Sequence, residues 1–168
     1  MHEESPQQPP PADAGDMDEH ISHHGVLIVD DNEQNLELLQ AYLEELGGGP
    51  IRVARDGLGA LDLVGQECPD VILLDIMMPR MSGYQVCERL KGDPATRDVP
   101  VIMVTALNEV GDVERAIDAG ADDFLTKPVN KLELLTRVRS LLRVRRLKRE
   151  LEQATAEIRA IREDHGTV

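Results

Sequence analysis

The sequence predicts an α/β fold, a doubly wound parallel sheet of five strands covered by helices on both faces. Short segments rich in Val, Ile and Leu alternate five times with segments of helical periodicity. The strand segments at 26–30, 70–75 and 99–105 are apolar almost throughout, which indicates burial on both faces and therefore a parallel sheet. Right-handed crossovers between such strands give the doubly wound arrangement.

The elements follow one another in a regular order along the chain. Strands are expected at 26–30, 51–54, 70–75, 99–105 and 123–126. Helices are expected at 32–49, 57–67, 83–91 and 109–120, followed by a long helix from near Asn130 to about Ile161. Ser82 is the expected N-cap of the third helix. Gly111, in the first turn of the fourth helix, is expected to loosen that helix.

Composition and charge divide the 168 residues into three parts. Residues 1–24 hold six acids, no Lys or Arg and many prolines, so we expect a disordered tail whose histidines are solvated rather than metal-bound. Residues 25–145 are expected to form the folded domain. Residues 146–168 are expected to form a helical, coiled-coil-like extension, and residues 131–168 together hold ten basic residues and six acids.

The composition also bounds the classes of partner. A net charge of −14 disfavours nucleic-acid binding by the whole protein on electrostatic grounds. No apolar run approaches the length of a membrane span, and the N-terminus lacks the basic and apolar regions of a secretory signal. Cys68 and Cys87 fit no metal or disulfide pattern, and we expect buried or half-buried thiols. These features together favour a cytoplasmic protein.

Polar side chains follow the carboxyl ends of four predicted strands. They are Asp30, Asp31, Asp75, Thr105 and Lys127. The ligand site of a doubly wound sheet lies at that edge, so we expect these side chains to converge. Three clustered carboxylates repel one another and need a cation, for which hard oxygen ligands favour Mg²⁺. A lysine and a hydroxyl beside that cation suit a phosphoryl group, either as a bound phosphate or as a group accepted by a carboxylate.

Four segments resemble the receiver domain of bacterial two-component response regulators over about residues 25–145. They read VLIVDDNEQNLELL, DVILLDIMMPRMSGYQVCERLK, VPVIMVTA and AGADDFLTKPV. The resemblance implies a flavodoxin-like sheet of strand order 2-1-3-4-5, with Asp75 as the phosphoacceptor. It implies Mg²⁺ as cofactor, held by Asp30, Asp31 and Asp75 with the backbone carbonyl of Met77, Asp31 being the more direct ligand of the acidic pair.

The same resemblance assigns the remaining site residues. Thr105 matches the switch hydroxyl, Lys127 the phosphate-binding lysine and Phe124 the switch aromatic residue. The Lys127–Pro128 peptide bond is expected to be cis, as is common in the family. Ser82 stands where many relatives carry Asp, and it should cap its helix equally well. The apolar Leu107 and Met77 flank the phosphoryl site and leave the lifetime of the phosphoryl group open.

Three functions fit these residues. The first is a phosphorylation-dependent switch that is not itself an enzyme. A sensor histidine kinase or a histidine phosphotransfer protein phosphorylates Asp75, and the binding of a downstream partner then changes. The second is a Mg²⁺-dependent phosphohydrolase acting through an aspartyl-phosphate, which Met77 disfavours because such enzymes usually carry a second acid at that position. The third is an unphosphorylated scaffold. The sequence leaves open whether the chain acts alone or belongs to a longer regulator.

The predicted long helix carries an apolar repeat near its end. Leu147, Leu151, Ala154, Ile158 and Ile161 recur at spacings of four and three, which is a short heptad seam. The seam favours a homodimer through this helix or a partner-binding helix. A solvated, frayed helix is the alternative, since so few heptads are marginal alone. The basic segment at 143–150 is weaker support for nucleic-acid binding.

Overall fold

The computed structural model describes residues 25–47, 49–106 and 110–165. The expectations for residues 1–24, including the histidines there, and for Leu107 lie outside this range. None of the helices in the described part of the chain combines the length and the apolar character that crossing a bilayer requires.

Five strands form one parallel sheet. They are β1 (Val26–Val29), β2 (Ile51–Ala54), β3 (Val71–Asp75), β4 (Val101–Thr105) and β5 (Asp123–Thr126). Their order in the sheet is β2-β1-β3-β4-β5, and all four strand pairs are parallel. This confirms the predicted fold class and the strand order.

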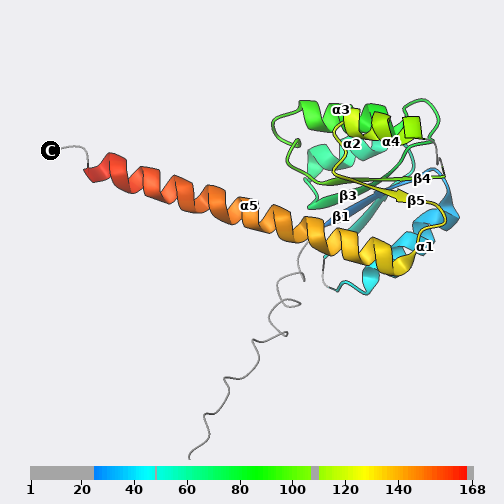
Figure 1. The fold of residues 1–168 in the computed structure, drawn as a ribbon, viewed down its shortest axis with the longest axis horizontal. Coiled ribbons are helices and arrows are strands. Elements are labelled where there is room, and N and C mark those ends of the chain that lie inside the picture. The colour runs from blue at the N-terminus through cyan, green and yellow to red at the C-terminus, as the bar shows by residue number, and fades with distance from the viewer. Residues whose placement is uncertain (1–24, 48, 107–109, 166–168) are drawn as a thin grey trace, which may run out of the picture.

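Helices cover both faces of the sheet (Figure 1). They are α1 (Glu33–Glu44), α2 (Gly57–Gln66), α3 (Gly83–Gly92), α4 (Val110–Asp118) and α5 (Lys131–His165). The side chains of α2, α3 and α4 pack on one face, and those of α1 and the first half of α5 pack on the other. The helix predicted at 32–49 ends earlier, at Glu44, because the chain turns there and Gly47 takes a positive φ of 73°.

Alternate residues of each strand point into two separate cores. Leu27 and Val29 of β1 belong to the core beneath α2, α3 and α4, whereas Val26 and Ile28 belong to the core beneath α1 and α5. All four side chains are buried. Burial on both faces explains why the strand sequences are apolar without interruption.

Local signals in the sequence are only partly confirmed. Ser82 caps α3, and its side chain and that of Gln85 form a reciprocal capping box. Asn130 accepts a hydrogen bond from the backbone N–H of Glu133 at the start of α5. Both cysteines are free, and Cys87 is buried as expected. The expectation for Cys68 is wrong, because its side chain is exposed in the turn after α2.

α5 is one helix of 35 residues, or about 50 Å at 1.5 Å per residue. Its first part packs on the sheet through buried side chains such as Leu134, Val138 and Leu142. From residue 151 to residue 164 every side chain is exposed, and the helix projects away from the domain (Figure 1). The predicted long helix is confirmed. The helix passes residue 145 without a break, and the domain boundary placed there stays a prediction.

Candidate functional site

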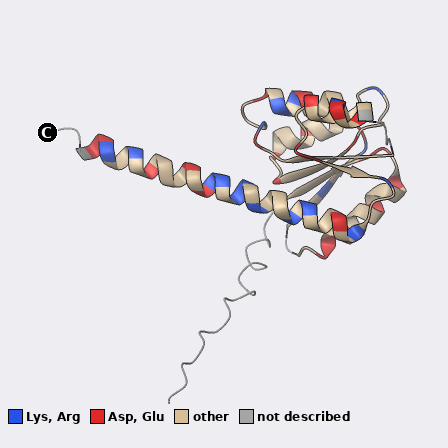
Figure 2. Cartoon of the chain, in the orientation of Figure 1, with Lys and Arg blue, Asp and Glu red and all other residues tan. Residues whose placement is uncertain are grey.

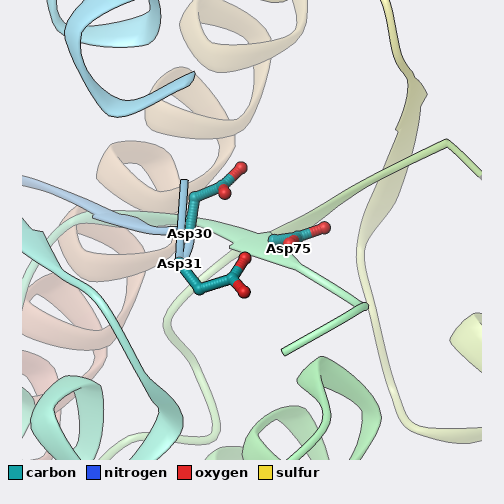
Figure 3. Close-up of side chains that lie close together, drawn as sticks. All are labelled: Asp30, Asp31 and Asp75. Atoms are coloured by element: carbon teal, nitrogen blue, oxygen red, sulfur yellow. The ribbon is translucent and has the colours of Figure 1, made fainter. Parts of the chain in front are cut away.

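Three carboxylates meet at the carboxyl edge of the sheet (Figure 3). Asp30 and Asp31 directly follow β1, and Asp75 is the last residue of the neighbouring strand β3. One carboxylate oxygen from each residue lies within 4.8 Å of the others. The parallel register of β1 and β3 ends both strands at the same level, which brings together side chains that lie more than forty positions apart.

The two adjacent acids differ in their surroundings. Asp30 is buried, with an exposed fraction of 1 %, whereas Asp31 is exposed. The backbone N–H of Asn32 donates to Oδ1 of Asp30 at 2.9 Å. Nδ2 of Asn35 donates to Oδ1 at 3.3 Å and to Oδ2 at 3.1 Å. Asp30 is therefore fixed in place, while the carboxylate of Asp31 is open to solvent.

Asn35 was not among the predicted site residues. It lies in the first turn of α1, five positions after Asp30, and its amide orients that carboxylate. An amide one turn into the helix that follows an acidic strand end could have indicated this role. The signal is weak in sequence alone, because asparagine is also common at helix starts for capping, as Asn32 shows here.

Lys127 brings a positive charge to the carboxylates from the loop after β5. Its Nζ lies 2.8 Å from Oδ2 of Asp30 and 3.4 Å from Oδ1 of Asp75. The Lys127–Pro128 peptide bond is cis, as expected. Burial lowers the pKa of the ammonium, but the hydrogen bond to Asp30 and the negative charge of Asp75 outweigh it and raise the pKa above 10.5. Lys127 therefore stays protonated and is ready to bind an anion.

Asp75, like Asp30, is buried. Its exposed fraction is 4 %. Burial raises the pKa of its carboxyl from 3.8 to about 6, Lys127 opposes that rise, and Asp30 adds to it. A hydrogen bond from the backbone of Met77 also favours the charged form. A poorly solvated carboxylate beside a lysine is a stronger nucleophile than one in bulk water, because less solvent must be removed before it reacts.

The remaining predicted residues lie around this cluster. Thr105 is the last residue of β4, directly after Val104, which pairs with Asp75 in the sheet, and it is fully buried. Phe124 lies on β5 and is half-buried against the core beneath α2, α3 and α4. Met77 lies in the loop after β3, and its side chain is exposed. Thr105 and Met77 thus lie at the carboxyl edge of the sheet, whereas Phe124 lies earlier on its strand, level with Met103 of β4.

Gly83 is a second residue that the sequence reasoning missed. It begins α3, and a Cβ at this position would lie 2.2 Å from the backbone oxygen of Asp75. The backbone N–H of Gly83 also donates to the carbonyl of Ile76 at 2.9 Å. Only glycine allows the start of α3 to approach the end of β3 this closely. The helix thereby fixes the backbone on which Asp75 stands.

The acidic set fits a hard divalent cation. Each of the three carboxylates offers an oxygen, and the exposed Asp31 leaves room for water in the coordination shell. The cluster contains three carboxyl groups, and Lys127 supplies one ammonium, which pairs with Asp30 and Asp75. Lys127 alone therefore does not neutralise the cluster. These observations favour Mg²⁺ over softer metals, since the cluster contains no thiolate or imidazole among the described residues.

A comparison with protein families settles which family has this site. The family model of the response regulator receiver domain matches residues 26–139. The chain belongs to this family. The match covers the whole sheet and the first part of α5, so the receiver domain contains every residue of the acidic cluster.

Curated relatives of the receiver domain include proteins of several bacteria. The chain is 46 % identical to the response regulator PleD of Caulobacter vibrioides over 131 residues, which cover 78 % of this chain and 29 % of PleD. It is 44 % identical to the DNA-binding dual master transcriptional regulator RpaA of Synechocystis over 118 residues, covering 70 % of this chain and 48 % of RpaA. The receiver thus spans less than half the length of either relative.

Solved receiver structures share the fold. The signal receiver domain of a signal transduction histidine kinase from Syntrophus aciditrophicus is 40 % identical, with a TM-score of 0.66. The match covers 71 % of this chain and 89 % of that one. The part of α5 that projects from the sheet is the largest described segment beyond the shared domain.

Proposed function

We propose that this receiver is a phosphoacceptor switch in which Asp75 takes a phosphoryl group from a histidine. The single observation that supports this most is the position of Asp75, a buried carboxylate at a strand end that lies 3.4 Å from the ammonium of Lys127 and in one cluster with two further acids. The donor is a sensor histidine kinase or a histidine phosphotransfer protein. The receiver itself does not turn over a substrate.

The chemical step needs little from the protein beyond positioning and charge. A carboxylate oxygen of Asp75 forms a bond to phosphorus while the bond between phosphorus and the donor nitrogen breaks. The donor nitrogen keeps the electron pair and takes a proton from solvent. Lys127 can pair with the negative charge of the transferred phosphoryl group, because its ammonium already lies 3.4 Å from Asp75. Thr105 donates its hydroxyl to an oxygen of the transferred phosphoryl group.

The cation site belongs to the same proposal. Asp30, Asp31 and Asp75 would hold Mg²⁺ together with the backbone carbonyl of Met77. When bound, Mg²⁺ offsets the negative charge that the carboxylates and the phosphoryl group bring together. Asp30 accepts a hydrogen bond from Asn35 and forms an ion pair with Lys127, so we assign it mainly a positioning role. Asp31 is the more direct ligand of the cation.

Phosphorylation would then change what the receiver binds. When Thr105 turns toward the phosphoryl group, space opens that the ring of Phe124 can fill. The surface formed by α4, β5 and α5 changes with it, and a downstream protein binds the altered surface. As a second part of the proposal, the subunits associate as a homodimer through α5. Nucleic acid is not an expected partner of this chain, given its net charge of −14.

Labelling with acetyl phosphate tests the assignment of Asp75. The full chain is incubated with acetyl phosphate and Mg²⁺, and the intact mass is measured. We expect one added phosphoryl group per chain and none in Asp75→Asn. Asp62→Asn is the matched control, because Asp62 is exposed on α2 and lies outside the acidic cluster. Full labelling of Asp75→Asn would show that the acceptor is another residue.

The same sample separates the switch from the phosphohydrolase alternative. Release of phosphate is followed over time with acetyl phosphate and with a simple phosphate ester. A switch gives stoichiometric labelling of Asp75 and no sustained turnover of the ester. Steady turnover of the ester that is lost in Asp75→Asn would establish the enzyme instead. Met77, which stands where such enzymes usually carry a second acid, supports the first outcome.

A further inference from the structure

The exposed half of α5 carries a longer apolar seam than the repeat that the sequence suggested. Val144 is also exposed, with an exposed fraction of 58 %, and it lies three residues before Leu147. It extends the alternating spacing of three and four back onto the part of α5 that packs on the domain. In heptad notation the a positions are Val144, Leu151 and Ile158, and the d positions are Leu147, Ala154 and Ile161.

We propose that a second copy of this chain covers this seam, and that the two α5 helices run parallel and in register from Val144 to Ile161. This rests on the proposed homodimer and adds its geometry. It does not depend on phosphorylation of Asp75. The occupant is a second copy because the seam has the heptad spacing of a helix pair. Val144 and Ile158 are β-branched at a positions and Leu147 is at a d position, the combination that favours two parallel strands, while Leu151 at an a position and Ile161 at a d position depart from it.

The seam points away from the domain to which its helix belongs. Leu142 and Arg145 are buried against the domain, whereas Val144 and Leu147 are exposed by 58 % and 49 %. In heptad terms the buried residues occupy b and f positions, which lie on the side of the helix opposite a and d. Two copies can therefore bring their seams into contact from Val144 onward, while each receiver domain lies on the side of its helix that faces away from the partner helix.

Ion pairs hold the start of the seam in a fixed direction. Nη1 of Arg149 lies 2.7 Å from Oδ1 of Asp70, and Nε of Arg145 lies 3.3 Å from the same oxygen. Nη1 of Arg145 also donates to the backbone oxygen of Asp98 at 2.7 Å, and Lys148 pairs with the Asp98 carboxylate. The buried Arg145 resists displacement, because its charge would lose these partners. α5 therefore leaves each domain at one angle.

Charges flanking the seam favour the parallel arrangement. In a parallel pair each g position faces the e position of the next heptad on the partner, which brings Glu157 to the partner's Arg162 twice in the dimer. Arg143 faces the partner's Lys148, a like-charge contact. Lys148 is already paired with Asp98, which offsets this repulsion. The colouring of the ribbon in Figure 2 shows that acidic and basic residues both occur along the projecting half of α5.

An antiparallel pair with the same layers has a less favourable charge pattern. It would place Glu150 against the partner's Glu157 twice, in the middle of the seam. Its compensating contact, Arg143 with the partner's Asp164, falls in the last turn of the helix, where helices fray. In the parallel pair the attractive contact, Glu157 with the partner's Arg162, lies within the seam. The repulsive contact is at Lys148, whose charge is already paired with Asp98.

Sedimentation of the full chain tests whether the seam joins two copies. We expect a species of twice the 18.6 kDa chain mass at protein concentrations on the order of 100 µM. Leu151→Asp should give monomer, and Ala156→Asp, an equal charge on the outer f position, should leave the dimer intact. Both residues are exposed, so neither change disturbs the domain core. A monomeric chain, or a dimer that survives Leu151→Asp, would overturn the proposal.

A charge reversal tests the direction of the helices. In the parallel pair Glu157→Arg brings two positive side chains together and should weaken the dimer roughly threefold to tenfold. Arg162→Glu should do the same, and the double change should restore the dimer. In an antiparallel pair Glu157→Arg faces the partner's Glu150 and would strengthen association. Strengthening by the single change would therefore contradict the parallel arrangement while leaving the dimer itself intact.

Disulfide trapping gives an independent measure of the register. Cys68→Ser removes the exposed native thiol, and burial raises the pKa of the Cys87 thiol to about 11, so Cys87 stays protonated and shielded. In this background Ile161→Cys should form a covalent dimer under mild oxidation, and Ala156→Cys on the outer face should not. Absence of the link at 161 in a chain that sediments as a dimer would exclude the parallel register. Labelling of Asp75 is measured on the same samples and is expected to be unchanged in every variant.

Discussion

Asp30 and Asp31 are neighbours in the chain, yet their side chains have opposite surroundings. Asp30 is buried and accepts hydrogen bonds from Asn35 and the backbone of Asn32, while Lys127 lies 2.8 Å from it. Asp31 has no such restraint among the described contacts and is exposed. At the scale of single residues, Asp30 is therefore held in place by its partners, and Asp31 is available to a cation from solvent.

Separate replacement of Asp31 and of Lys127 should distinguish a ligand of the cation from a residue that binds only the phosphoryl group. We predict that Asp31→Ala weakens Mg²⁺ binding by at least roughly tenfold, because a direct ligand is lost. Lys127→Ala should retain Mg²⁺ binding but weaken the response to phosphorylation, since its ammonium is needed for the phosphoryl oxygens. Calorimetric titration with Mg²⁺ measures the metal affinity of both variants, as the chain contains no tryptophan to report binding by fluorescence, and hydrogen exchange with a phosphoryl mimic measures the response of Lys127→Ala. An unchanged affinity in Asp31→Ala would contradict these roles.

Gly83 offers a second test at the same scale. We predict that Gly83→Ala lowers the free energy of unfolding by about 1–3 kcal/mol, because the added Cβ would lie 2.2 Å from the backbone oxygen of Asp75. Gly65→Ala in α2 is the control. A Cβ added at Gly65 would meet no neighbouring atom within 4 Å, so this change should raise stability by about 0.5–1 kcal/mol. Urea unfolding measures both changes, and equal effects would show that the close approach at Gly83 is unimportant.

At the scale of elements, α4 connects the phosphoryl site to the surface expected to change. It lies between β4, which ends in Thr105, and β5, which carries Phe124. The hydroxyl of Tyr84 on α3 donates to the backbone oxygen of Asp112 at 3.2 Å, and the guanidinium of Arg115 lies 4.4 Å from the centre of the Tyr84 ring. These contacts tether α4 to α3. Gly111 is expected to lower the stability of α4, and the contacts with Tyr84 counteract this effect.

Hydrogen exchange should reveal whether this element responds. We predict that beryllofluoride with Mg²⁺, a mimic of the phosphoryl group, changes amide exchange in the segment from β4 through β5. Two states a few kcal/mol apart are enough for such a shift, provided that the mimic binds one of them better. Thr105→Ala should reduce the change without preventing binding of the mimic. Identical exchange in both states, while partner binding still responds, would mean that the signal takes another route.

At the scale of the whole molecule, Asp70 joins three distant segments at the amino edge of the sheet. Its Oδ2 accepts from the backbone N–H of Gly25 at 3.1 Å, and its Oδ1 contacts Arg145 and Arg149 of α5. The start of β1, the start of β3 and the middle of α5 are thereby held together. This edge lies opposite the acidic cluster, so the path from the site to the projecting helix spans the domain.

Replacing this one carboxylate should loosen the attachment of α5. We predict that Asp70→Asn lowers the free energy of unfolding by about 1–3 kcal/mol, because the buried Arg145 loses a charged partner. Asp62→Asn, on an exposed position of α2, should have little effect. Urea unfolding of both variants tests this. If the two changes cost the same, Asp70 does not hold the helix in solution.

The sequence by itself determined the sheet and predicted most of the candidate site. Continuous apolar strands required a parallel sheet, and the acids at two strand ends and the lysine after a third then had to share one edge, because parallel strands end on the same side. Asp30, Asp31, Asp75, Thr105 and Lys127 could therefore be named in advance. Helix ends were less certain, since the chain leaves α1 five residues before the predicted end.

Only the tertiary structure decided which of these residues are held and which are free. The amide of Asn35, the close approach at Gly83 and the hub at Asp70 all depend on contacts between segments that no local pattern encodes. The direction of the apolar seam is of the same kind. The heptad spacing is written in the sequence, but burial of Leu142 and Arg145 fixes the rotation of α5 about its axis. Packing against the sheet therefore determines that the seam, including Val144, faces away from the domain.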